Sequence, residues 1–135
     1  MNPRDIKLKD LRPEIPSAKI NDNMSFDERF QNETLRPVAK LQDELLLAVF
    51  SNYITKHKNK FYELKLEKRF EYIENAIQRD IKFRNSLKGV IIGQFTLEEY
   101  DRYIKNSSAL NKRMMNIVKE RIQSNIQLLE NKMAY

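Results

Sequence analysis

Four polar residues at helical spacing are the first candidates for binding chemistry in this 135-residue chain. Arg84 falls within the apolar stripe of a helical pattern, and Asp80 stands four residues before it, at the edge of that stripe. Arg121 and Asn125 repeat this arrangement in a later helical pattern. Because an unpaired buried charge costs several kcal/mol, an arginine directed toward a core needs a partner.

This arrangement leaves three alternatives open. Asp80 and Arg84 form an ion pair within one helix that also joins neighbouring helices. Alternatively, Arg84 and Arg121 face one pocket and bind a carboxylate or phosphate in bidentate fashion, with Asp80 and Asn125 beside them. In the third alternative the helix is shorter, and Arg84 is exposed to solvent.

A basic run with two aromatic residues is the second candidate, because cations contact phosphates and aromatic rings stack on bases. The run KHKNKFYELKLEKR contains five residues that could contact nucleic acid: Lys56, Lys58, Lys60, Phe61 and Tyr62. Glu63 and Glu67 interrupt it, and no helix-turn-helix signature accompanies it. With His57 among these cations, the run predicts either a solvated helix end or a weak nucleic-acid contact.

The two glycines of the chain, Gly89 and Gly93, lie four residues apart on one side of a helical pattern. Glycine costs about 1 kcal/mol relative to alanine in a helix interior, so the pair indicates close approach to the backbone. The spacing matches the membrane motif GxxxG, but the required long apolar stretch is missing. We therefore expect a second helix or the N-terminal segment to pack against both glycines.

Composition limits the kinds of site that the chain can form. The absence of cysteine excludes disulfides, thiolate metal ligands and cysteine nucleophiles. One histidine is too few for the imidazoles that zinc and non-haem iron sites use, so we expect no metal and no cofactor. The formal charge of +6 permits attraction to nucleic acid or anionic lipid without requiring it. With no visible secretory signal and only short apolar runs, we expect a cytoplasmic protein without a membrane span.

Helical periodicity predicts an all-α, single-domain bundle of four to five helices with an extended N-terminal arm. The arm, residues 1–24, holds three of the four prolines, and the helical domain covers residues 25–135. Whether the arm is ordered stays open. It has four apolar residues to bury if it lies on the domain: Leu8, Leu11, Ile15 and Ile20.

Capping patterns place the predicted helices of the domain. SFDE at 25–28 starts a short helix, Thr34 caps a long one that ends near Lys58, and TLEE at 96–99 starts another short one. A long helix from about 66 to 94 either runs unbroken or bends near 85–86, and the last helix follows NSS at 106–108. No segment shows the alternation of a strand.

Three stretches carry a resemblance to a known family: RDIKLKDLRPEIP, FQNETLRPVAKLQDELL and FRNSLKGVIIGQFTLEEY. With them the chain resembles a family of short all-helical proteins of the flavobacterial lineage, some of whose members are labelled glyoxalase. That label implies paired βαβββ modules and a divalent metal held by His and Glu. This sequence has no evident strand and one histidine, so the resemblance supplies no catalytic residue.

The helical patterns also predict a surplus of apolar surface. The long helix that Thr34 caps and the last helix each carry two apolar faces, more than one small bundle readily hides. A homodimer or another protein partner is therefore expected. We predict a non-enzymatic protein-interaction or scaffold module. The alternatives are a nucleic-acid-associated accessory protein and a small-anion binder or enzyme at Arg84 and Arg121.

Overall fold

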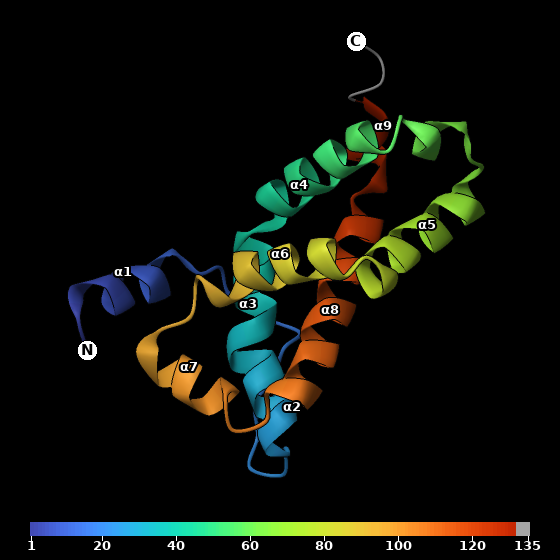
Figure 1. Cartoon of the computed structure of the whole chain (residues 1–135). Helices are drawn as coiled ribbons and strands as arrows, with labels where there is room; N and C mark the ends of the chain where they lie inside the picture. Colours follow the sequence, from blue (N-terminus) through green and yellow to red (C-terminus); the bar gives the residue numbers. More distant parts are fainter. Residues whose placement is uncertain (132–135) are drawn as a thin grey trace.

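A computed structural model describes residues 1–131 of the protein, and this part of the chain is all-helical, without strands (Figure 1). The α-helices are α1 (Pro3–Leu11), α2 (Phe26–Phe30), α3 (Arg36–Leu41), α4 (Asp43–Lys56), α5 (Leu66–Arg79), α6 (Ile81–Ile92), α7 (Leu97–Tyr103), α8 (Ser107–Ser124) and α9 (Ile126–Asn131). A π-helical turn, Gln31–Leu35, joins α2 to α3, and a 3-10 turn, Lys60–Glu63, precedes α5. The predicted all-α class is confirmed.

The predicted number of four to five helices is wrong, because each long helix is interrupted by a residue outside the helical conformation. Gln42 separates α3 from α4, and Asn125 separates α8 from α9. Asp80 separates α5 from α6, with extended backbone angles (φ −86°, ψ 97°) and its side chain capping the new helix at Phe83. The helix therefore breaks at Asp80. Residues 85–86, where one of the two predicted alternatives placed a bend, lie within α6.

The core forms around α8, which packs against α3, α4, α5 and α6. Helices from both halves of the chain thus meet on one element, as Figure 1 shows for α3 and α8. At one end of the core, Phe50 of α4 contacts Phe61 edge-to-face, with the ring centroids 5.8 Å apart. Within residues 1–131, no helix combines the length and the apolar character that crossing a membrane requires.

The N-terminal arm is not extended throughout, because residues 3–11 form α1. Asn2 caps this helix by accepting a hydrogen bond from the Asp5 amide, and Pro3 lies in the first turn, where its missing N–H costs nothing. The helix ends at Leu11, and Arg12, directly before Pro13, is extended as a residue before proline must be. Proline therefore begins and ends a helix here, and the prediction of a wholly extended arm is wrong.

The close packing predicted at the glycines is wrong for Gly89. Gly89 is exposed, and a Cβ added there would meet no atom within 4 Å. Gly93 ends α6, and a Cβ there would approach the Gly89 carbonyl oxygen of the same helix at 3.0 Å. The N-terminal arm does reach Gly93, but through Arg4, whose Nη2 donates to the Gly93 carbonyl oxygen at 2.9 Å.

Candidate functional site

The structure does not form the predicted Asp80–Arg84 ion pair. One carboxylate oxygen of Asp80 accepts from the Phe83 amide at 3.2 Å, and the other accepts from the Tyr53 hydroxyl at 3.0 Å. Arg84 is half-buried, and its side chain has no hydrogen bond or ion pair within the described residues. The pair fails because the helix break turns Asp80 into a cap, which commits its carboxylate to Phe83 and Tyr53.

Arg121 is also committed elsewhere than predicted. It forms a two-pronged ion pair with Asp43 of α4, in which Nε donates to Oδ1 at 2.7 Å and Nη2 donates to Oδ2. The hydrogen bonds that Arg121 donates to Asp43 raise the pKa of Arg121 above its ordinary value. Asn125 donates to the Arg121 carbonyl oxygen at 2.8 Å. The ion pair ties α8 to α4, so the guanidinium that was predicted to bind an anion together with Arg84 binds Asp43 instead.

The cationic run loses one of its two predicted stacking residues. Phe61 is fully buried in the core, so its ring cannot stack on a base. Tyr62 is half-buried, and its hydroxyl donates to the Leu129 carbonyl oxygen at 3.4 Å. The three lysines of the run, Lys56, Lys58 and Lys60, are exposed. The cations at this helix end are therefore available to a ligand, but Phe61 is not.

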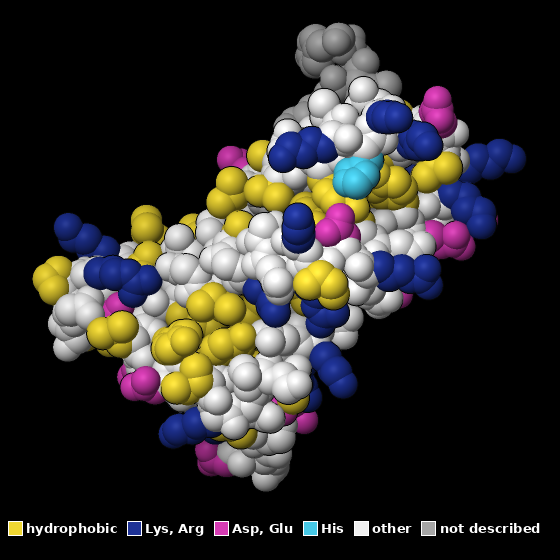
Figure 2. Space-filling model, viewed as in Figure 1, with side chains coloured by type: hydrophobic (Ala, Val, Ile, Leu, Met, Phe, Trp, Pro, Cys, Tyr) yellow, Lys and Arg dark blue, Asp and Glu magenta, His cyan; other side chains and the backbone are white. Residues whose placement is uncertain are grey.

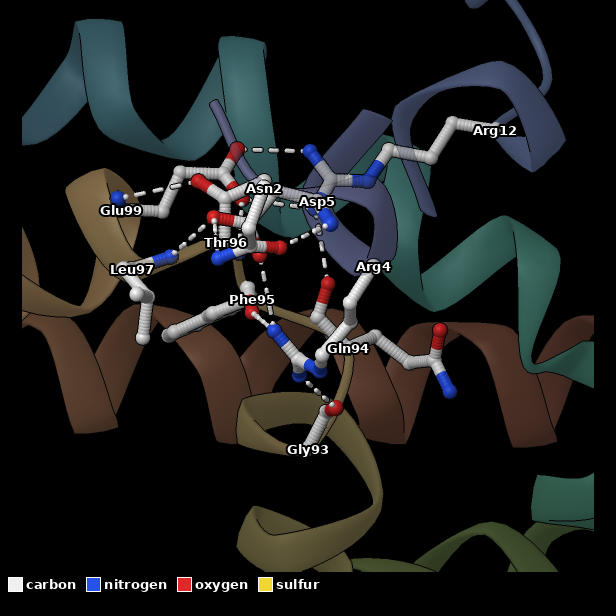
Figure 3. A network of polar contacts seen from close by, with 10 residues as sticks. All are labelled: Asn2, Arg4, Asp5, Arg12, Gly93, Gln94, Phe95, Thr96, Leu97 and Glu99. Carbon is white, nitrogen blue, oxygen red and sulfur yellow. Dashed lines mark hydrogen bonds and ion pairs between the residues drawn. The ribbon is translucent and has the colours of Figure 1, made fainter. Parts of the chain in front are cut away.

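A polar network that the sequence did not reveal fixes the arm to the domain (Figure 3). We name this network the arm junction, and it consists of Arg4, Asp5, Arg12, Thr34, Thr96 and Glu99. At its centre, Nη1 and Nη2 of Arg12 each donate to one oxygen of Glu99 at 2.6 Å. Nη2 also donates to the Gln94 carbonyl oxygen at 2.8 Å. Only 7% of the Arg12 side chain and 5% of the Glu99 side chain are exposed, so this is a buried ion pair.

Glu99 is further stabilised by two threonines. Its carboxylate accepts from the Thr34 hydroxyl and from the Thr96 amide, both at 2.8 Å. The Thr96 hydroxyl in turn accepts from the Glu99 amide, which confirms the capping box predicted at TLEE. Burial alone would raise the pKa of Glu99, but the hydrogen bonds from Arg12, Thr96 and Thr34 outweigh it and lower the pKa to about 2. Thr34 therefore serves this network and does not cap a helix.

The beginning of the arm is held in the same way. Asp5 is buried and accepts from the Leu97 amide at 3.1 Å. Arg4 donates to the Phe95 carbonyl oxygen at 3.0 Å in addition to its bond to Gly93. Figure 3 shows α1 placed against residues 93–97, which connect α6 to α7. The arm is held by polar contacts with the Glu99 side chain and with backbone groups, whereas two of the four apolar residues that it could bury, Leu11 and Ile20, are exposed.

A depression of about 640 Å³ adjoins the arm junction. Its charged residues are largely paired with one another, since Arg12 binds Glu99 and Arg102 donates to Glu33 at 3.0 Å. Nε of Arg12 is the one buried side-chain polar atom without a hydrogen bond within the described residues. Four of the seven charged residues of the depression are therefore engaged, and Lys9, Glu14 and Glu98 are exposed and unpaired within the described residues.

The outer side of α7 is apolar although it faces solvent. Leu97, Tyr100 and Ile104, the last at the end of the helix, are 61%, 45% and 53% exposed. Glu99 and Tyr103 lie on the opposite side of α7 and are buried. We name Leu97, Tyr100 and Ile104 the α7 face. Figure 2 shows hydrophobic side chains gathered over α7, so this helix is apolar on the side where a surface helix is normally polar.

A second depression, of about 610 Å³, lies where the end of α4 meets the break between α5 and α6. We name it the His57 pocket and describe it by six of its lining residues: Tyr53, His57, Tyr72, Arg79, Asp80 and Lys82. The Tyr53 ring contacts His57 and Phe83, with a centroid distance of 4.1 Å in each case. In Figure 2 the single histidine, in cyan, lies beside hydrophobic side chains with lysines and arginines around it.

The titratable groups of the His57 pocket differ in how they are held. Burial, together with the hydrogen bond to Asp80, raises the pKa of Tyr53 to about 12. The hydrogen bond from the Phe83 amide lowers the pKa of Asp80, and burial raises that of Tyr72. The side chains of Tyr72, Arg79 and Lys82 have no hydrogen bond or ion pair within residues 1–131. The pocket thus joins Asp80, predicted for one site, to His57, which lies within the predicted basic run.

Comparisons with protein-family models, curated proteins and solved structures find no match for this chain. The resemblance to flavobacterial proteins therefore stays a prediction from sequence motifs. In the described part of the chain, no three His, Cys, Asp or Glu side chains are grouped so that they could hold a metal ion.

Proposed function

We propose that the protein is a non-enzymatic interaction module that self-associates through the α7 face. The observation that carries this proposal is the exposure of Leu97, Tyr100 and Ile104 on one side of a helix whose other side is buried. Clustered apolar side chains on a surface gain free energy when a partner removes them from water, by about 25 cal/mol per Å² buried.

The α7 face stands on a fixed base, which favours a role in binding. Glu99, on the inner side of α7, is tied to Arg12 and Thr34, and Tyr103 donates to Asn111 of α8 at 2.5 Å. A helix held in this way presents its outer side chains without further ordering. The entropic cost of association is therefore smaller than it would be for a mobile helix.

The charges beside the α7 face favour a second copy of the chain as the partner. Glu98 lies in the first turn of α7 and Lys105 lies just past its end; both are exposed and unpaired within the described residues. At 100° per residue they fall on the same flank of the helix. If two copies pair their α7 helices antiparallel about a two-fold axis, Glu98 of one meets Lys105 of the other, and Leu97 meets Ile104.

Light scattering behind a sizing column tests the proposal on three proteins. The unmodified chain should elute as a dimer, and Ile104→Glu, which places a charge in the apolar contact, should convert it to a monomer. The matched control is Leu66→Glu on α5, because Leu66 is equally exposed, at 53%, but lies outside the α7 face. It should remain a dimer. A wild-type monomer, or a dimer that Ile104→Glu leaves intact, would contradict the proposal.

A further inference from the structure

The His57 pocket holds several polar groups that are not engaged within the described residues. Arg79 and Lys82 are exposed cations without an ion pair, and the Tyr72 hydroxyl has no hydrogen-bond partner within the described residues. The one carboxylate of the pocket, Asp80, already has both oxygens bonded within the protein. An anion that enters the pocket can therefore accept hydrogen bonds from Arg79, Lys82 or the Tyr72 hydroxyl. Asp80 does not engage these donors, because its carboxylate is already hydrogen-bonded to Tyr53 and Phe83.

The walls of the pocket add flat and apolar surface to these cations. His57 rests on Tyr53, and its side chain is otherwise exposed to the pocket and to solvent. Ala76 and Ile81 supply apolar lining. Because Tyr53 is covered by His57 and Phe83, a planar ring can lie against the outer face of the imidazole, while an attached anionic group reaches Arg79 or Lys82.

We propose that the His57 pocket binds a small phosphorylated molecule with a planar ring, of the mononucleotide class. The volume of about 610 Å³ lies in the range of small-molecule sites. A smaller depression of about 320 Å³ adjoins the His57 pocket. It shares Tyr53, His57, Asp80 and Lys82 with the pocket and adds Lys56. Lys56, an exposed lysine of the basic run, thus adds a positive charge to the surface around His57.

A small ligand fits these observations better than a nucleic-acid strand. Strand binding uses several aromatic platforms in succession along a basic groove. Here Phe61 is buried in the core and the hydroxyl of Tyr62 is hydrogen-bonded to Leu129, so the platform does not continue along the run. What remains is one ring-sized surface with cations on its border.

The single histidine gives the test a direct reporter, because the Hδ2 and Hε1 signals of its imidazole are the histidine ring C–H signals of the chain. Adenosine monophosphate, ribose 5-phosphate and inorganic phosphate are titrated separately into the full chain. The proposal expects a saturable shift of the His57 signal with adenosine monophosphate, upfield from the ring current of the stacked base. Ribose 5-phosphate should bind more weakly, because it lacks the ring.

The variant Arg79→Gln with Lys82→Gln should weaken binding of adenosine monophosphate at least about tenfold, the loss expected when charge-assisted contacts are removed. The matched control, Lys7→Gln with Lys112→Gln, removes the same charge from exposed positions outside both the pocket and the α7 face and should bind as the wild type does.

Four results would overturn the proposal. One is the absence of a saturable shift with adenosine monophosphate, and another is equal weakening by the control variant, which would indicate general charge attraction. The third is binding of inorganic phosphate as tight as that of the nucleotide, which would show that the ring adds nothing. A shift seen only with a single-stranded oligonucleotide would also overturn it and would assign the surface to nucleic acid.

Discussion

The arm junction and the His57 pocket both combine a carboxylate, cations and hydroxyl groups, yet they use them in opposite ways. In the junction, Glu99 accepts hydrogen bonds from Arg12, Thr34 and Thr96, and the ion pair is almost completely buried. In the pocket, Arg79 and Lys82 are exposed and unpaired within the described residues. Buried charges must be paired to be tolerated, so the first group fixes the chain, whereas exposed charges cost little to leave free and can bind a ligand.

The two carboxylates show the same contrast. Glu99 is held by side chains from the arm and from the turn before α3, so its bonds join segments far apart in the sequence. Asp80 is held first by the amide of Phe83 within its own helix start, and then by Tyr53. Removal of Glu99 should therefore be felt by the whole fold, and changes in the pocket should be felt mainly by a ligand.

The largest effect is expected from Glu99→Ala, which leaves the Arg12 guanidinium buried without its partner. Loss of one member of a buried pair lowers the free energy of unfolding by about 3 to 5 kcal/mol. Urea denaturation measures this loss, and Glu120→Ala on α8 is the matched control, because Glu120 is exposed, unpaired within the described residues and distant in sequence from α7. The control should change the free energy by less than about 0.5 kcal/mol. Equal effects of the two variants would show that the junction does not stabilise the fold.

Acid should weaken the junction next. The pKa of Glu99 is lowered from 4.5 to about 2 in the folded protein, so the carboxylate contributes stability that is complete above its unfolded pKa and is lost as the pH falls through the folded one. Between about pH 5 and pH 2 this loss is on the order of 3 kcal/mol. Denaturation curves of wild type and Glu99→Gln, measured across this range, should therefore converge. Parallel pH dependence of the two proteins would contradict the assigned pKa.

The smallest effect is expected in the pocket. Arg79→Gln with Lys82→Gln should change the free energy of unfolding by less than about 0.5 kcal/mol per substitution, because neither cation has an ion pair to lose within the described residues. Thermal and urea unfolding of the variant measure this directly. A large loss of stability would show that these cations take part in the fold, and the contrast between the two regions would fail.

Local patterns predicted the class of the fold well, because helix periodicity and capping depend on residues near one another in the chain. TLEE formed the expected capping box at Thr96 and Glu99, and Ser25 accepts from the Glu28 amide as its pattern indicated. The helix breaks were missed for a similar local reason. At Asp80 a residue that fits a helical stripe also caps well, and the sequence alone did not decide between these two uses.

The candidate sites were predicted less well, because the pairing of distant residues depends on how the helices pack. Arg121 was correctly seen as a charge in need of a partner, but that partner is Asp43, far away in the sequence. The cost of glycine in a helix predicts a packing position at Gly89, yet Gly89 faces open space. Glu99 was recognised as part of a capping box, and nothing local indicated that Arg12 and Thr34 would also bind it.

The sequence by itself determined that the chain is helical, where several of its helices begin, and that it lacks the cysteines and histidines of common metal sites. Tertiary structure alone decided which charges are buried and paired, which side of α7 is left apolar, and that His57, Tyr53 and Asp80 meet in one pocket. The physical reason is the distance along the chain over which each kind of interaction acts. Backbone hydrogen bonds and caps join residues within about one helical turn, whereas burial and ion pairing depend on where separate helices come together.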